Sequence, residues 1–173
     1  KIMGVGDFDG DGKSDILWRN TSSGQGSIWK SGNGATSQAV STLADQNWKI
    51  VGVGDFDGDG KSDLLWRNTA TGVNTIWKSG NSATSQGVAP LSNQDFKVVG
   101  VGDFDGDGQA EIVFSSPWGL GVLEQRKNTF APLMMAPNGT RFGGWNLQTG
   151  DNRFGQVSDF AGDGRAELLI TSP

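Results

Sequence analysis

The chain has no cysteine, no histidine and no tyrosine among its 173 residues. Without cysteine the fold cannot depend on disulfides, so the sequence indicates neither an oxidising nor a reducing compartment. Without histidine and cysteine the chain also lacks the commonest general base, the thiol nucleophile and the imidazole metal ligand. We therefore predict that it is not an enzyme.

Long apolar runs are missing as well. Hydrophobic residues make up 35% of the chain, and they occur in runs far shorter than the roughly 18 residues that a membrane-spanning helix needs. Membrane insertion is therefore not expected. The net charge of −5 and the lack of a basic run disfavour nucleic acid as a partner. Proline is scarce, with 5 residues, whereas 28 glycines indicate many tight turns between short strands.

Acidic residues are concentrated in four short clusters that hold 15 of the 19 carboxylates. The clusters are Asp7, Asp9, Asp11 and Asp15; Asp55, Asp57, Asp59 and Asp63; Asp103, Asp105, Asp107 and Glu111; and Asp159, Asp163 and Glu167. Like charges packed this closely repel one another unless a cation lies among them. The sequence therefore predicts bound cations, and three divalent ions would change the net charge from −5 to +1.

The sequence repeats itself. Residues 1–48 and 49–96 are identical at most positions when they are aligned at an offset of 48 residues. A third copy begins at Lys97 (KVVGVGDFDGDGQAEIVF), and a more diverged fourth copy begins at Arg153 (RFGQVSDFAGDGRAELLI). We predict a single, partial domain over residues 1–173, with repeats at 1–48, 49–96, 97–152 and 153–173, the last of them incomplete.

Each repeat has a pattern of strands and turns without helical spacing. In the first repeat, residues 2–8, 14–20, 27–30 and 38–43 are predicted strands. Four short strands per repeat are typical of a β-propeller blade, whereas helical repeats need two or three helices per unit, which the glycine content disfavours. The predicted fold class is all-β: four-stranded antiparallel blades, about three and a half of them present. Since even four such blades need about 190 residues, we expect part of a longer, seven-bladed ring.

The loop sequence DFDGDGKSD indicates calcium. Aspartates at its first, third and fifth positions place carboxylates on one side of a tight turn, and the glycine at its sixth position permits that turn. The seventh residue can offer only its backbone carbonyl, and an acid at the ninth position completes the shell. Oxygen ligands alone select Ca²⁺ over transition metals and Mg²⁺. The predicted ligands are the clustered carboxylates named above and the carbonyls of Lys13, Lys61, Gln109 and Arg165.

The start of this loop coincides with that of an EF-hand, but the EF-hand interpretation fails. Its twelfth position requires glutamate, and here that position is Trp18, Trp66, Phe114 or Ile170, each within a predicted strand. The repeats instead resemble the FG-GAP or VCBS repeats of integrin-α-type β-propellers, which carry a DxDxDGxxD calcium loop between their first two strands. The resemblance covers essentially the whole chain and implies a secreted or cell-surface propeller with structural Ca²⁺.

Two observations qualify the calcium prediction. The fourth loop has Ala161 in place of the second aspartate, so we expect about three calcium sites and a fourth, degenerate one. The alternative interpretation is that the acidic loops are solvated turns, as Asp-Gly turns often are. Three loops of the same pattern in register favour calcium, and their recurrence in each repeat favours a structural role for the ion.

Seven tryptophans form the other prominent group. Trp18, Trp66, Trp29 and Trp77 recur at equivalent strand positions, which indicates packing between blades. Trp118 and Trp145 occur only in the third repeat. The stretch around Trp145 resembles FG-GAP-type propeller lectins, including fungal ones, in which a Gly-Gly-Trp element precedes an Arg-containing strand and sugars bind between adjacent blades. That resemblance implies a ligand site formed by Trp145, Asn146, Asn152 and Arg153.

Two function classes therefore remain open. The first is a calcium-stabilised extracellular module that binds carbohydrate or a cell-surface glycoconjugate. The second is an adhesion or protein-interaction propeller without sugar binding. Tryptophan near amide and guanidinium groups suits the apolar face and the hydroxyl edge of a sugar, which favours the first class. Glycosylation acceptors at Asn20 and Asn138 would matter only in a eukaryotic secretory host.

Overall fold

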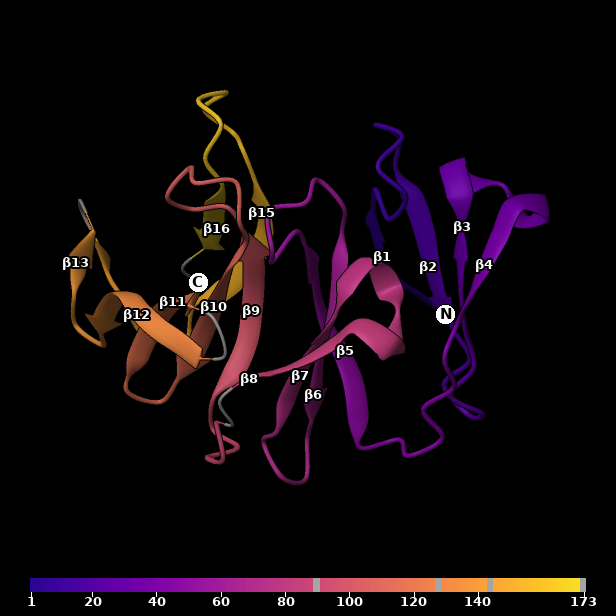
Figure 1. Ribbon diagram of the computed structural model, residues 1–173. Coiled ribbons are helices and arrows are strands. Elements are labelled where there is room, and N and C mark those ends of the chain that lie inside the picture. Colours follow the sequence, from indigo (N-terminus) through magenta and orange to yellow (C-terminus); the bar gives the residue numbers. More distant parts are fainter. Residues whose placement is uncertain (89–90, 127–128, 143–144, 172–173) are drawn as a thin grey trace. The chain divides into compact units, whose positions relative to one another are not determined.

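The computed structural model describes residues 1–173 except 89–90, 127–128, 143–144 and 172–173. The described chain consists of short strands, turns and four 3-10 helices (Figure 1). The strands are β1 (Ile2–Gly6), β2 (Asp15–Arg19), β3 (Gly26–Trp29), β4 (Ser37–Val40), β5 (Trp48–Gly54), β6 (Asp63–Asn68), β7 (Asn74–Trp77), β8 (Ser85–Val88), β9 (Lys97–Gly102), β10 (Glu111–Ser116), β11 (Gly119–Arg126), β12 (Thr129–Pro137), β13 (Arg141–Phe142), β14 (Trp145–Asn146), β15 (Arg153–Ser158) and β16 (Glu167–Thr171). The 3-10 helices are η1 (Lys30–Gly32), η2 (Gly34–Thr36), η3 (Lys78–Gly80) and η4 (Ser82–Thr84). The chain divides into two compact units, residues 1–92 and 93–173, which are described separately.

The first unit holds two antiparallel sheets with the same topology, in the orders β1-β2-β3-β4 and β5-β6-β7-β8. Their registers correspond residue by residue, with Ile16 opposite Trp29 in one sheet and Leu64 opposite Trp77 in the other. The first strand of each sheet also shifts its register at the same place. The duplicated sequence therefore folds into duplicated sheets whose strands begin and end within a few residues of the predicted bounds.

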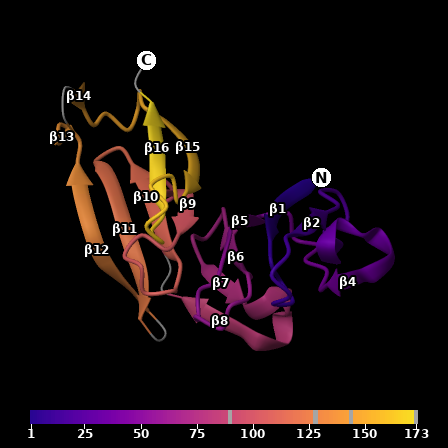
Figure 2. The ribbon, with the colours of Figure 1, turned by 90° about the horizontal axis from the view of Figure 1, so that it is seen from above.

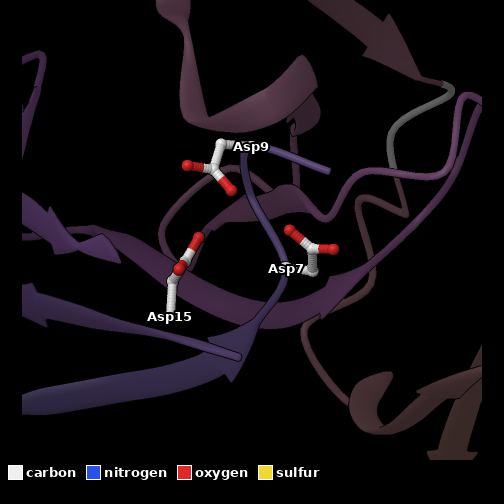
Figure 3. Close-up of side chains that lie close together, drawn as sticks. All are labelled: Asp7, Asp9 and Asp15. Atoms are coloured by element: carbon white, nitrogen blue, oxygen red, sulfur yellow. The ribbon is translucent and has the colours of Figure 1, made fainter. Parts of the chain in front are cut away.

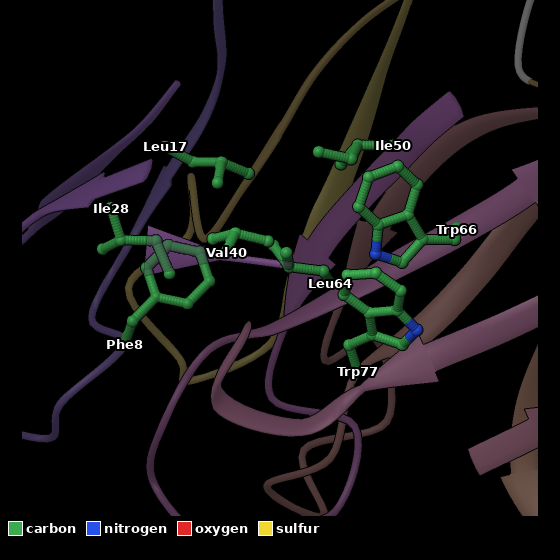
Figure 4. Close-up of a cluster of buried hydrophobic side chains, with 8 residues drawn as sticks. All are labelled: Phe8, Leu17, Ile28, Val40, Ile50, Leu64, Trp66 and Trp77. Carbon is green, nitrogen blue, oxygen red and sulfur yellow. The ribbon is translucent and has the colours of Figure 1, made fainter. Parts of the chain in front are cut away.

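The core of the first unit combines side chains from both sheets (Figure 4). Its buried members are Phe8, Leu17, Ile28, Val40, Ile50, Leu64, Trp66 and Trp77. Strand β6 is buried along its whole length, whereas β2 alternates between buried and half-buried positions. A strand that is buried at every position is covered on both faces, as a blade strand that packs on a neighbouring blade is.

Arg19 joins the two sheets of this unit. Arg19 as a whole is 3% exposed, and the carbon of its guanidinium lies 4.9 Å from the ring centre of Trp66. Its Nη1 donates to the carbonyl of Trp48 at 2.6 Å, and its Nη2 donates to the carbonyl of Leu43 at 2.8 Å. A side chain at the end of β2 therefore satisfies backbone carbonyls near the start of the second sheet.

The second unit contains the sheet β12-β11-β10-β9, whose strands lie side by side in Figure 2, and two-stranded sheets β15-β16 and β13-β14. Its buried core includes Val113, Val122 and Leu147, against which Phe154 of β15 and Leu168 of β16 pack. Strand β10 is buried throughout, as β6 is. The outer strands differ from those of the first unit, because β11 and β12 span 8 and 9 residues where β3 and β4 span 4 each.

The prediction of an all-β fold made of partial propeller blades is confirmed. Each of the first three repeats forms a four-stranded antiparallel sheet, and the fourth contributes β15 and β16. That these sheets make one domain within a seven-bladed ring stays a prediction. Of the helices in the described ranges, each is a single short 3-10 turn, and none is long and apolar enough to cross a membrane.

Candidate metal centres and a neighbouring pocket

Each acidic loop joins the first two strands of its sheet, and glycine makes the turn possible. In the first loop Gly10 and Gly12 have φ angles of +78° and +80°, a left-handed conformation that side chains with a Cβ adopt only at a cost. The corresponding glycines of the other three loops share this conformation. The DGDG pattern therefore folds the backbone around its own carboxylates.

The first aspartate of each loop holds the turn together. Oδ1 of Asp7 accepts the N–H of Gly10 at 2.7 Å and that of Asp11 at 3.2 Å, and Oδ2 accepts the N–H of Gly12 at 2.8 Å. Asp55, Asp103 and Asp159 make the equivalent bonds. Desolvation tends to raise the pKa of Asp7, but the three backbone donors outweigh it and the pKa lies below its usual value. This carboxylate is therefore ionised and preorganised.

The ninth residue of each of the first three loops is a buried carboxylate. Asp15 and Asp63 have no exposed surface, and Glu111 is 1% exposed. One oxygen of each accepts a backbone N–H from within its loop, and Asp15 and Asp63 accept a second N–H, from Ser31 and Ser79. Desolvation raises the pKa of Asp63 to about 6 and that of Glu111 to about 7. Because burying carboxylates without a counter-charge is costly, these positions favour a cation nearby.

The loops bring their carboxylates together in groups of three. Within each group, one oxygen per residue lies within 4.8 Å of the others. The groups are Asp7, Asp9 and Asp15; Asp55, Asp57 and Asp63; Asp103, Asp105 and Glu111; and Asp159, Asp163 and Glu167. Figure 3 shows the first triad, with its three carboxylates around a common space. The fourth group is more exposed than the other three.

The donor set fits a calcium ion. Oδ1 of Asp9 is buried and has no hydrogen-bond partner in the described part of the chain, so one ligand oxygen is desolvated without compensation. All the gathered donors are carboxylate oxygens, which suit a hard cation. The residues that would hold the ion are the first, third and ninth of each of the first three loops.

The fifth-position aspartates are not part of the first three groups. Oδ1 of Asp11 accepts the N–H of Lys13 at 2.8 Å, and Oδ2 accepts its ammonium at 3.0 Å. Asp59 and Asp107 likewise accept the backbone N–H two residues further on. In the fourth loop, where Ala161 occupies the third position, Asp163 does join the group. The carbonyl ligands expected at the seventh positions stay predictions.

Two lysines that the sequence analysis did not select reach these centres. Nζ of Lys30 lies 3.2 Å from Oδ2 of Asp9, and Nζ of Lys78 lies 2.8 Å from Oδ2 of Asp57. The hydrogen bond to Asp57 raises the pKa of Lys78. The one sequence feature that could have indicated them is the WKSG segment, which recurs in both of the first two repeats.

Consecutive loops within a unit are also linked through the backbone. The N–H of Ser62, in the second loop, donates to the carbonyl of Asp7 in the first at 2.6 Å. The N–H of Ala166, in the fourth loop, donates to the carbonyl of Asp103 in the third at the same distance. Each of these bonds ties the residue that heads one loop to the end of the next loop.

A pocket of about 370 Å³ lies in the second unit, between the sheet of the third repeat and β15. It is lined by Asp95, Lys97, Val99, Ser115, Ser116, Pro117, Thr149, Gly150, Asn152 and Phe154. Of the predicted ligand residues, Asn152 lines the pocket, and its Oδ1 accepts the N–H of Gln148 at 2.6 Å. Asn146 and Arg153 are exposed and do not line it, and the side chain of Trp145 lies outside the described part of the structure.

An aromatic pair, exposed Trp118 and half-buried Phe96, adjoins this pocket. Trp118 is 58% exposed, and its ring centre lies 5.9 Å from that of Phe96. Trp118 follows the lining residue Pro117 in the chain, and Phe96 lies between the lining residues Asp95 and Lys97. The sequence marks Trp118 as particular to the third repeat, but it gives no sign of a site there, because Phe96, whose ring lies beside that of Trp118, is distant in sequence.

Comparison with known proteins agrees with the repeat structure. The family model for the FG-GAP-like repeat matches residues 7–66 and again residues 55–114. A search of curated proteins found no match. Among solved structures, the chain is similar to one in the crystal structure of TcdB2-TccC3-TEV, with 15% identity and a TM-score of 0.51 over 90% of this chain and 8% of that one. It is also similar to the V. cholerae biofilm matrix protein Bap1, with 18% identity and a TM-score of 0.36 over 98% of this chain and 27% of that one. At such identities the likeness concerns the fold alone.

Proposed function

The chain belongs to the FG-GAP-like repeat family, and from this premise we propose that it is a calcium-stabilised extracellular binding module. The observation that carries the proposal is the carboxylate triad, which recurs in three loops, each time with a buried carboxylate at the ninth position. Calcium accepts six to eight oxygen ligands in flexible geometry, so backbone carbonyls and water would complete a shell that three carboxylates begin. When bound, the ion supplies the positive charge that the buried carboxylates lack.

The proposed role of the ion is structural. Extracellular calcium modules bind with dissociation constants of about 10⁻⁴ to 10⁻³ M, and an ion at 100 times its dissociation constant adds roughly 2.7 kcal/mol per site. Three loops should bind firmly. The fourth should bind weakly or not at all, because Ala161 removes a carboxylate and its group is exposed. Affinities in this range suit a secreted or cell-surface protein, since calcium is plentiful there.

Metal content tests this proposal directly. Protein purified in calcium should carry about three ions per chain, and Asp57→Ala should remove one of them because it deletes a member of the second triad. Lys61→Ala is the matched control, since only its carbonyl is proposed as a ligand, and should leave the count unchanged. Protein without calcium after dialysis against the ion, or an unchanged count in Asp57→Ala, would contradict the proposal.

For the ligand, we propose carbohydrate at the pocket of the second unit. A sugar offers an apolar C–H face and an edge of hydroxyls. The pocket combines hydroxyl, amide and charged groups, and the exposed ring of Trp118 adjoins it. This combination favours sugar binding over the alternative, an adhesion or protein-interaction surface. Single sites of this kind are weak, and repetition around a ring would raise avidity by about 10²- to 10⁴-fold.

A glycan array distinguishes the two ligand classes. The unsubstituted chain should bind a defined set of glycans, and Trp118→Ala should lose them. Met135→Ala should keep them, because neither this similarly exposed residue nor its neighbours in the chain line the pocket. Binding that survives Trp118→Ala but fails in Trp145→Ala would place the ligand at the site that the sequence predicted instead. Absence of any glycan binding would favour the protein-interaction alternative.

The proposal includes no catalytic step. Outside the loops the carboxylates are Asp45, Asp95, Glu124 and Asp151, and no two of them form a pattern typical of acid–base catalysis. Glu124 is engaged in an ion pair with Arg126. We therefore expect a binding protein without enzymatic activity or nucleic-acid partners.

A further inference from the structure

Two of the acidic loops are contacted by an ammonium group from outside the loop. Lys30 and Lys78 begin the 3-10 helices η1 and η3 directly after the third strand of their sheets. Their Nζ atoms lie 3.2 Å and 2.8 Å from the third-position carboxylates Asp9 and Asp57. Both ion pairs are only partly exposed, so solvent screens them less than it screens a surface pair.

The turns that carry these lysines are held by hydrogen bonds to carboxylates of the triads. Ser31 and Ser79, the residues after the lysines, have φ angles of +49° and +48°, which are unfavourable for a serine. Each donates its N–H to Oδ1 of the buried ninth-position aspartate, at 2.7 Å to Asp15 and 2.8 Å to Asp63. The same carboxylate therefore belongs to the triad and holds the turn that carries the ammonium.

The two carboxylate oxygens of Asp9 differ in their surroundings. Its Oδ2 contacts the ammonium of Lys30, and its Oδ1 is the buried oxygen that has no hydrogen-bond partner in the described residues. An ion bound at Oδ1 would leave the ammonium in place on Oδ2. The two cations would then repel each other across one carboxylate.

The third loop lacks this arrangement. Ile16 and Ile112 hold equivalent positions in the first and third sheets, and their partners on the next strand are Trp29 and Leu123. The residues that follow these partners, Lys30 and Glu124, therefore correspond to each other. In the first two repeats the chain turns at this point into η1 or η3, whereas in the third repeat β11 continues as a strand. Glu124 forms an ion pair with Arg126, and among the described residues no ion pair joins the third loop to a lysine or arginine.

Other cations near the loops do not remove this difference. The side chain of Arg165 lies over Gly106 in the third loop, but that of Lys61 lies over Gly10 in the first in the same way. The seventh residue, by contrast, is lysine in the first two loops and Gln109 in the third. The first two loops thus hold more positive charge than the third.

We propose that Lys30 and Lys78 are resident cations that set the calcium affinity of the first two loops. The proposal rests on calcium binding as the proposed function. Without calcium, each ammonium offsets carboxylate repulsion and stabilises its loop. With calcium, it opposes the ion, so the third loop binds calcium most tightly. A unit charge about 6 Å from a divalent ion, at a water-like dielectric constant, changes the affinity about tenfold.

The test replaces each lysine by methionine, which keeps the side chain as far as Cε and removes the charged Nζ. Calcium titration by calorimetry should show about tenfold tighter binding at one site in Lys30→Met or Lys78→Met and at two sites in the double variant. In a chelator the same variants should melt at a lower temperature than the unsubstituted protein. The gap should close as calcium is added. Lys49→Met is the control, because Lys49 is exposed on β5 and is in none of the ion pairs of the described residues, so both effects should be small.

The possible failures are distinguishable. If the variants melt lower by the same amount with and without calcium, and their titrations are unchanged, the lysines are merely structural and this proposal is wrong. If calcium affinity falls, the ammonium groups assist binding and the proposal is also wrong. If the unsubstituted protein binds no calcium at all, the proposed function fails first and this inference fails with it.

Discussion

At the scale of single residues, the ninth-position carboxylates combine two tasks. Asp15, Asp63 and Glu111 each accept a backbone N–H from the start of their own loop and also face the other members of a triad. Full burial makes the charged form costly, as the raised pKa values of Asp63 and Glu111 show. These residues therefore couple the geometry of the loop to the charge at its centre.

This coupling predicts an unusual pH dependence of stability. The folded-state pKa values of about 6 and about 7 lie above those of the unfolded chain, near 4. The folded state therefore binds more protons in this interval, and calcium-free protein should lose stability as the pH rises from about 4 to about 7. With saturating calcium the trend should reverse, because the ion requires ionised ligands. Melting temperatures measured across this range in both conditions check the prediction.

The matched variant for this measurement is the double substitution Asp63→Asn and Glu111→Gln. It removes both titrations while keeping the side-chain volumes, so the calcium-free slope between pH 5 and 7 should flatten. A calcium-free protein whose melting temperature rises through this interval would show that other groups dominate and that the two carboxylates are not stabilised by protonation.

Part of each centre could be predicted from the sequence, and part could not. The spacing of Asp7 and Asp9 identified two triad members because alternate residues of a tight turn share one side. The spacing could not show that Asp11 turns to Lys13 instead. Nor could it place Lys30 beside Asp9, which depends on the pairing of β2 with β3 and on the left-handed conformation of Ser31.

At the scale of elements, the end of β2 determines how the two sheets of the first unit are joined. Arg19 is the buried cation that spans this junction, with two carbonyl acceptors and the face of Trp66. Arg19→Met should destabilise the chain by about 2 to 4 kcal/mol, because it leaves two partly buried carbonyls unpaired and removes the contact with the ring. Urea unfolding measures this loss.

Two further substitutions make the Arg19 prediction specific. Arg19→Lys should recover less than half of the loss, since an ammonium cannot span two acceptors as a planar guanidinium does. Lys49→Met, at an exposed position of β5, should change the stability by less than about 0.5 kcal/mol. If Arg19→Met costs no more than Lys49→Met, the guanidinium does not join the sheets.

The strands themselves were predictable because short apolar runs alternate with glycine-rich turns in every repeat. The four 3-10 turns were not, since helices of three residues leave no periodic pattern. The long hairpin of β11 and β12 was not predicted either. The third repeat differs from the first two in sequence there, so repetition gave no guidance to its register.

At the scale of the whole molecule, calcium is expected to be part of the fold. An acidic loop joins the first two strands of each of the four repeats, and backbone hydrogen bonds link the loops within each unit. Removing calcium should therefore lower the melting temperature by many degrees, since each firm site contributes roughly 2.7 kcal/mol at 100 times its dissociation constant. Thermal unfolding followed by circular dichroism, in calcium and in excess chelator, measures the difference, and coincident curves would contradict the prediction.

The most direct measurement is a crystal structure of the chain grown in calcium, with anomalous scattering used to locate the ions. We expect anomalous peaks at the triads headed by Asp7, Asp55 and Asp103, each within about 2.3 to 2.6 Å of its carboxylate oxygens, and a weak peak or none at Asp159. Triads without anomalous density at millimolar calcium, with their carboxylates bonded to lysines or water alone, would show that these loops are not calcium sites.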